Sequence, residues 1–173
     1  EAVLAEVFPD PTGQLPSGWI VRNVGDISKP PQYGYTQSAQ NEPVGPRFLR
    51  ITDIQDGLVD WSSVPYSECD QATFGRYKLI DGDIVFARSG ATTGKTLLIT
   101  DPPDAVFASY LIRLQIINDA TPDFVYWFFQ SPNYWKQIVL RGGAQPNMNA
   151  QILRSVRVPI LADPLAQSEL VAG

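Results

Sequence analysis

Short apolar runs of β type, each closed by turn-forming residues, divide this chain and limit the folds open to it. Turn formers such as Asp56-Gly57 and Asp81-Gly82 separate the runs, which is typical of strands and hairpins. The chain shows no repeated alternation of strand and helix, so a parallel wound sheet is not indicated. The expected strands are Trp19–Val24, Arg47–Thr52, Gly57–Trp61, Asp83–Ala87, Thr96–Thr100, Ala105–Gln115 and Val156–Ile160.

One region has helical periodicity instead. Between Pro122 and Leu140, aromatic and aliphatic residues recur at helix-like intervals, and Ser131-Pro132-Asn133 interrupts them where a second helix can be capped. This pattern predicts a helical hairpin on a sheet, with Trp127 and Trp135 in the core. A further short helix is expected near Asn149, and the class is α+β.

Both ends of the chain have helical character. Glu1–Phe8 is helix-prone and stops at the breaker cluster Pro9–Gly13, while Asp163 and Pro164 provide a cap and an N1 proline for a helix that continues to the end. We therefore expect one module bounded by two truncated helices.

Composition excludes several kinds of active site. The chain has no histidine and one cysteine, Cys69, which removes Ser-His-Asp and Cys-His nucleophilic sites, thiolate metal clusters and an intrachain disulfide. It also lacks a signal-peptide pattern and any run of about 18 apolar residues. We expect a soluble, intracellular protein.

The charge distribution is uneven. The net charge of -5 argues against a nucleic-acid partner, yet residues 1–83 hold twelve acidic and six basic residues, and residues 84–173 hold six acidic and seven basic ones. No acidic residue lies between Phe124 and Ala162. A negatively charged partner can therefore meet the second half of the chain.

The segment Asp81–Thr96 runs a short apolar strand into a loop of small residues, hydroxyls and two cations. It resembles a phosphate-binding P-loop, but Ser89 stands where the first glycine belongs, and the following residues favour a strand over a helix. We expect a polar hairpin tip. A nucleotide-binding enzyme that uses Ser89–Thr96 remains the alternative.

This hairpin tip carries donors suited to nucleic acid. Arg88 and Lys95 can bind phosphates or guanine, and Ser89, Thr92 and Thr93 add adaptable hydroxyls. A solvated tip without a ligand is the other interpretation.

Two further loops have ambiguous chemistry. Tyr33-Gly34-Tyr35-Thr36 is either an aromatic turn or a contact loop, and the amides of Gly142–Asn149 either bond adenine or cap a helix.

Several acidic motifs are interpreted as turns. The pairs Asp81/Asp83 and Asp53/Asp56 are expected to be solvated turn residues. Asp101–Asp104 resembles the Asp-Pro-Pro motif of amino-methyltransferases but lacks its stacking aromatic, so a turn is expected there as well.

The order of the motifs along the chain carries a resemblance to a family. The series resembles the target recognition domain of the DNA specificity subunit of type I restriction-modification systems, over residues 15–161. Its motifs are Leu15-Pro16-Ser17-Gly18-Trp19, Val24-Gly25-Asp26-Ile27, Tyr33-Gly34-Tyr35-Thr36, Phe48–Gly57, Gly82–Gly90, and Gly143-Ala144-Gln145 leading to Val158-Pro159-Ile160.

The resemblance implies a fold and a function. The fold is a twisted, β-helix-like arrangement of strands with a C-terminal α-hairpin, flanked by conserved helices, of which residues 1–10 are the end of one and residues 163–173 the start of another. The function is non-catalytic reading of one half of a bipartite site in double-stranded DNA. The module itself has no cofactor, and S-adenosylmethionine belongs to the partner methyltransferase subunit.

The same resemblance implies partners and contacts. The partners are methyltransferase subunits and, indirectly, the restriction or translocase subunit, in the cytoplasm of a bacterium or archaeon and without a membrane. Phosphate contacts are expected from Arg88 and Lys95, with Arg141 or Arg154 as further candidates. Bonds to base edges are expected from Tyr33, Tyr35, Thr36, Thr92, Thr93, Gln145 and Asn147, and Arg50 and Ser89 are further expected DNA-binding residues. A third hypothesis, a module that docks on protein through Trp127 and Trp135, requires both rings to be exposed.

Overall fold

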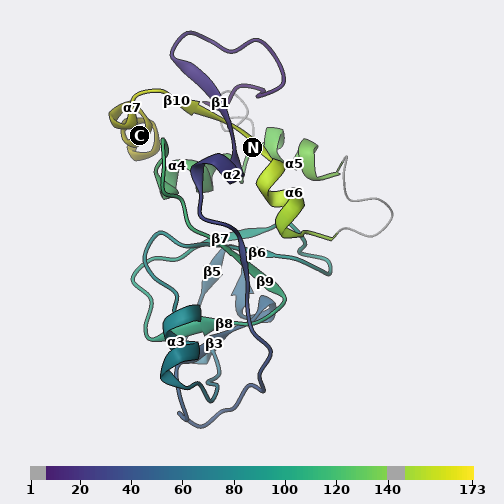
Figure 1. Cartoon of the computed structure of the whole chain (residues 1–173), viewed down its shortest axis with the longest axis vertical. Coiled ribbons are helices and arrows are strands. Elements are labelled where there is room, and N and C mark those ends of the chain that lie inside the picture. The colour runs from purple at the N-terminus through teal and green to yellow at the C-terminus, as the bar shows by residue number, and fades with distance from the viewer. Residues whose placement is uncertain (1–6, 140–146) are drawn as a thin grey trace.

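The structure is a computed structural model that describes residues 7–139 and 147–173, and its element order is shown in Figure 1. The strands are β1 (Trp19–Asn23), β2 (Gln32–Tyr33), β3 (Arg47–Leu49), β4 (Ile54–Gln55), β5 (Leu58–Val59), β6 (Ile84–Ala87), β7 (Thr96–Leu98), β8 (Ala105–Phe107), β9 (Leu111–Leu114) and β10 (Arg157–Leu161). The helices are α2 (Val24–Ile27), α3 (Gln71–Tyr77), α4 (Pro122–Phe128), α5 (Pro132–Val139), α6 (Ala150–Ser155) and α7 (Pro164–Ala172). The α+β class is confirmed.

A central sheet of order β2-β9-β6-β7 separates the molecule into two parts (Figure 1). The β1/β10 pair and helices α4 to α7 lie on one side, and β3, β8 and α3 lie on the other. Strand β6 is buried along its whole length: Ile84 and Phe86 enter one hydrophobic cluster, whereas Val85 enters the other. Since successive side chains of a strand point to opposite faces, this continuous apolar run fits a strand covered on both sides.

Strands distant in sequence pair with one another. Strands β1 and β10 are antiparallel, with Ile20 opposite Ile160, so residues near the two ends of the module lie side by side. The predicted strand Ala105–Gln115 divides into β8, which pairs with β3, and β9, which pairs with β6. The β3/β8 pair is parallel and was not expected from the sequence.

The predicted helix pair is confirmed as α4 and α5. Thr121 caps α4 and accepts a hydrogen bond from the Phe124 N–H, while the Ser131 hydroxyl accepts one from the Tyr134 N–H at 3.4 Å. The helix expected near Asn149 is α6. Helix α3 was missed, although Asp70 caps it by accepting from the Thr73 N–H at 2.7 Å.

Two expectations about burial are wrong. Trp127 is not in the core, because it is 42% exposed on α4; Trp135 is partly buried against the main cluster. The hypothesis of docking through Trp127 and Trp135 requires two exposed rings, but only the Trp127 ring is exposed. In the acidic pairs, Asp81 and Asp56 are exposed, but Asp83 is buried and the Asp53 side chain is 7% exposed.

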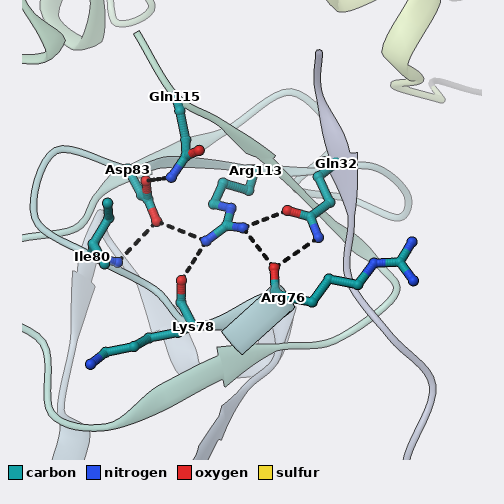
Figure 2. Close-up of polar contacts among 7 residues, drawn as sticks. All are labelled: Gln32, Arg76, Lys78, Ile80, Asp83, Arg113 and Gln115. Carbon is teal, nitrogen blue, oxygen red and sulfur yellow. Dashed lines mark hydrogen bonds and ion pairs between the residues drawn. The ribbon is translucent and has the colours of Figure 1, made fainter. Parts of the chain in front are cut away.

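Asp83 is buried because it pairs with Arg113 of β9 (Figure 2). The Arg113 Nη1 lies 3.2 Å from the Asp83 Oδ2, and their side chains are 8% and 2% exposed. Asp83 also accepts hydrogen bonds from the Ile80 N–H at 3.0 Å and from the Gln115 amide at 2.8 Å. Desolvating two charges is costly, and these extra bonds offset that cost.

The guanidinium of Arg113 completes this network on its other side. It donates to the carbonyl of Arg76, which lies in α3, and to the carbonyl of Lys78, which follows that helix. It also donates to the side-chain oxygen of Gln32 on β2. The Gln32 amide in turn donates to the Arg76 carbonyl at 3.0 Å. One arginine therefore joins β9, β2, the turn before β6 and α3 (Figure 2).

Gly34 marks a close crossing of backbones. The Gly34 N–H donates to the Leu111 carbonyl at 3.1 Å, and a methyl group at Gly34 would overlap the Ala108 carbonyl. No side chain larger than hydrogen fits there, since the obstacle is backbone.

Substitution of Gly34 by alanine is predicted to destabilise the fold. We expect Gly34→Ala to lower the free energy of unfolding by about 1–3 kcal/mol through overlap. Gly75→Ala is the matched control, because Gly75 lies inside α3 and a methyl group there would meet no atom within 4 Å. Alanine at this position should raise the free energy of unfolding by as much as about 1 kcal/mol. Urea unfolding measures both. Equal effects of the two changes would contradict the close crossing.

Removal of one charge from the buried pair is predicted to cost far more than removal of an exposed one. Asp83→Asn should lower the free energy of unfolding by about 3–5 kcal/mol, because Arg113 keeps a buried charge without a counterion. The control is Asp119→Asn, which breaks the exposed Arg22–Asp119 pair and should cost less than about 1 kcal/mol. Denaturant unfolding of the two variants makes the comparison, and similar losses would refute it.

Candidate nucleic-acid interface

Residues 88–95 form the connection of an antiparallel hairpin between β6 and β7. The turn is closed by bonds from the Gly94 N–H to the Ala87 carbonyl at 2.8 Å and from the Lys95 N–H to the Thr92 carbonyl at 2.9 Å. Gly90 and Gly94 adopt positive φ of 82° and 85°, which glycine allows. A strand follows this loop, so the P-loop alternative, which needs a helix N-terminus, is wrong.

The helix pair holds the base of this hairpin. The buried Tyr134 hydroxyl donates to the Gly94 carbonyl at 2.7 Å, and the Gln130 amide donates to the Thr96 hydroxyl at 2.7 Å. Burial raises the pKa of Tyr134, so its phenol stays protonated as the donor. The tip therefore projects from a fixed base and exposes Lys95, Gly90 and Ala91.

A cleft lies on one side of the hairpin, between its tip, the β4–β5 turn and the helix pair. Its volume is about 660 Å³, and its walls combine hydroxyl, amide and aromatic side chains with one cation, Lys95, and one carboxylate, Asp56. Side chains that line it include Thr52, Gln55, Ser89, Thr92, Lys95 and Trp135. Such a mixed lining suits hydrogen-bonding edges and flat rings.

A second hollow of about 540 Å³ adjoins this cleft. Ser89, Thr52 and Ile51 line both, so the two form one continuous surface. The second hollow adds predicted contact residues and the 62% exposed Tyr110. We call the lining of these two hollows the hairpin surface; it includes Tyr35, Thr36, Arg50, Thr52, Asp56, Ser89, Thr92, Lys95 and Tyr110.

Arg88 and Tyr33 pack together at the edge of this surface. The guanidinium carbon lies 4.6 Å from the centroid of the Tyr33 ring, and Nη1 donates to the Ser109 carbonyl at 3.2 Å. Ser109 lines the second hollow. The Tyr33 hydroxyl accepts from the Ala150 N–H of α6 at 2.9 Å, and the Arg88 carbonyl accepts from the Met148 N–H at 2.9 Å. Strand β2, the end of β6 and the start of α6 therefore meet here.

The two other cations of the surface differ in their surroundings. Arg50 donates twice to Asp53, at 3.1 and 2.9 Å, and this hydrogen bonding raises the pKa of Arg50. The pair is close to neutral, so Arg50 offers directed donors more than charge. Lys95 is exposed and, within residues 7–139 and 147–173, has no acidic partner.

Tyr35 and Thr93, both predicted to bond bases, have internal partners. The Tyr35 hydroxyl lies 2.7 Å from that of Ser67, and burial raises the pKa of Tyr35 to about 12. Its ring packs on Phe48 and Tyr77. Thr93 is 8% exposed and donates to the Gly90 carbonyl at 2.7 Å. Both side chains support the backbone on which their neighbours are displayed.

The amide loop lies only partly within the described residues. Gln145 and Arg141 fall outside them. Asn147 is exposed beside Met148, while Asn149 accepts from the Ile152 N–H at 2.8 Å and caps α6. Arg154 lies in a separate hollow with Asn23 and Asp26.

Sequence reasoning missed Thr52, Gln55 and Tyr110. Thr52 and Gln55 come from a stretch read as strand and turn, and the signal available there was the Asp56-Gly57 turn beside them. Tyr110 was hidden in the apolar run 105–115, although Ser109-Tyr110 interrupts that run with polar groups.

The described part of the chain holds no cluster of acidic or cysteine side chains that could bind a metal ion. None of its helices is long and apolar enough to cross a membrane.

Comparison with known proteins identifies relatives over most of the chain. The family model described as type I restriction modification DNA specificity domain matches residues 16–167. The MjaX type I restriction enzyme specificity subunit of Methanocaldococcus jannaschii is 26% identical over 170 residues, 92% of this chain and 39% of that protein. The EcoKI specificity subunit of Escherichia coli is 27% identical over 146 residues, 80% of this chain and 31% of that protein.

Solved structures share the fold. A chain from a structure of a type I restriction-modification system superposes with a TM-score of 0.77 at 20% identity, over 99% of this chain and 41% of that one. The HsdS subunit of Thermoanaerobacter tengcongensis gives 0.70 at 20% identity, over 99% and 40%. This chain thus spans about two fifths of the length of these proteins. The chain belongs to the family of type I restriction-modification DNA specificity domains.

Proposed function

We propose that this chain reads the base sequence of one half of a bipartite DNA site, as part of a type I restriction-modification specificity subunit. A DNA specificity domain is a recognition component and not an enzyme. The observation that carries the proposal is the hairpin surface, where Lys95 and several hydroxyls line two adjoining hollows and Arg88 is bonded to the Ser109 carbonyl at their edge. Hydroxyl, amide and guanidinium groups are those that bond base edges and phosphates.

The rest of the proposal concerns the complete subunit. This chain spans about two fifths of its solved relatives, which leaves room for a second recognition domain of similar size. Methyltransferase subunits would then be positioned over the site, and they would bind S-adenosylmethionine; the restriction subunit would join through them. We place the complex in the cytoplasm of a bacterium or archaeon, where its DNA is found.

The hairpin surface carries little positive charge, and this affects how strongly the module is expected to bind DNA. The chain has a net charge of -5, and Arg50 is paired with Asp53. Specific protein–DNA interfaces bury about 1,000 Å² of protein or more. We therefore expect weak DNA binding by the isolated module and strong binding by the complete subunit.

Exchange of residues 15–161 between specificity subunits tests the proposal directly. If this module reads one half-site, replacing it with the matching segment of a relative should change one half of the methylated motif and leave the other half unchanged. Mapping methylated adenines in the genome of a host that expresses each subunit with its methyltransferase measures this. An unchanged motif would reject the proposed function.

Lys95 is predicted to make a phosphate contact that does not depend on sequence. Lys95→Ala should weaken binding of the complete subunit to all DNA sites alike and reduce the slope of log Kd against log salt by about 1. Lys78→Ala is the matched control, because Lys78 is also exposed but lies beside Asp104 and Phe74 and lines neither hollow of the hairpin surface. Fluorescence anisotropy at several salt concentrations gives both slopes. An equal change of slope in the two variants would contradict a phosphate contact of Lys95.

A further inference from the structure

We propose that Arg88 reads a guanine in the major groove, and that Tyr33 is a positioning residue that holds its guanidinium for that contact. The inference rests on the proposed function and names one base class within it. The sequence left Arg88 open between phosphates and guanine, and this inference selects guanine. It also gives Tyr33, which was expected to bond a base edge, a different role.

The guanidinium of Arg88 is held in place before any ligand binds. The Tyr33 ring lies against one face of it, at 4.6 Å, and the Ser109 carbonyl accepts from its Nη1 at 3.2 Å. Its backbone is fixed as well: the Arg88 N–H donates to the Tyr110 carbonyl at 3.1 Å, and its carbonyl accepts from Met148 at 2.9 Å. An arginine held in this way loses little freedom when it binds.

The remaining donors of Arg88 are available. Within the described ranges, Nε and Nη2 have no bonded acceptor, and no carboxylate pairs with the guanidinium. Nε–H and one N–H of Nη2 point the same way in the plane of the guanidinium, and such a fork matches two acceptors side by side in one plane. Guanine O6 and N7 present such a pair in the major groove, and arginine is their commonest partner.

Tyr33 is fixed from several directions, which makes it a suitable support. It lies on β2 opposite Ile112 of β9, and its hydroxyl accepts from the Ala150 N–H at 2.9 Å. Its neighbour Gln32 belongs to the Arg113 network, and Gly34 lies at the close backbone crossing. Because Arg88 covers one face of the ring, that face is closed to a base.

Lys95 offers a contrast on the same surface. It is an exposed ammonium group without a described ion-pair partner, which suits a phosphate as a point charge. A base contact and a phosphate contact respond differently to salt and to sequence. Arg88 should therefore determine which base is preferred, and Lys95 should determine how strongly binding falls with salt.

The test uses the complete specificity subunit with its methyltransferase partner. Binding is measured to the methylated motif and to duplexes that carry each of the other three bases at every position of the half-site, at several salt concentrations. Arg88→Ala should reduce the preference for guanine at one position by about 10- to 100-fold and leave the salt slope unchanged. Arg88→Lys, which keeps the charge but not the planar fork, should keep less of that preference than the unsubstituted subunit.

Paired substitutions of Tyr33 test its positioning role. Tyr33→Leu removes the ring and should lower the preference at the same base pair, with no change at other positions. Tyr33→Phe keeps the ring and should retain most of that preference. A merely structural role would weaken binding to all duplexes equally.

Defined outcomes would overturn the inference. If Arg88→Ala weakens binding to all duplexes equally and lowers the slope of log Kd against log salt by about 1, Arg88 contacts a phosphate. If Arg88→Lys retains the full guanine preference, the fork is not used. An unchanged preference in Tyr33→Leu removes the positioning role. If the unsubstituted subunit shows no base preference in this half-site, the proposed function itself fails, which is a separate result.

Discussion

The buried ion pair between Arg113 and Asp83 is the interaction on which the arrangement of the module depends. Arg113 sits in the middle of β9 and its guanidinium also lies 5.1 Å from the Phe107 ring, so it faces the cluster below the central sheet. Through its five contacts, segments distant in sequence are held at one point. A buried pair gives this precision only when every donor and acceptor has a partner, and no buried side-chain nitrogen or oxygen lacks one in the described residues.

How far the sequence predicts this fold depends on how local each element is. The hairpin 84–98, the helix pair and the caps at Asn149 and Asp163 are set by near neighbours, and all of them are present. The parallel β3/β8 pair joins residues more than fifty positions apart, and periodicity holds no information on such pairing. The pairs Asp56-Gly57 and Asp81-Gly82 predict turns, but they do not indicate that the neighbouring carboxylates of Asp53 and Asp83 point inward. The other residues of Leu111–Leu114 are apolar, so Arg113 in this strand was the available signal that Asp83 has a buried partner.

The same distinction applies to the candidate site. Arg88 and Lys95 could be named from one loop, because a hairpin tip places both near each other. The stacking of Arg88 on Tyr33 could not be predicted in this way, because it joins the residue after β6 to strand β2. Tyr35 and Thr93 carry suitable hydroxyls, but their partners, Ser67 and the Gly90 carbonyl, are set by how the chain folds around them. Residue type identifies a possible donor; the fold decides what it bonds.

The pairing of β1 with β10 has a consequence for how such a module can vary. Because Trp19 lies opposite Leu161, the chain enters and leaves the domain through one antiparallel ladder. Insertions, deletions or a wholly different set of loops between these strands would leave the entry and exit points where they are. A larger protein can thus accept a new version of the domain without rebuilding the scaffold on either side, and the tolerance lies in those five paired residues on each strand.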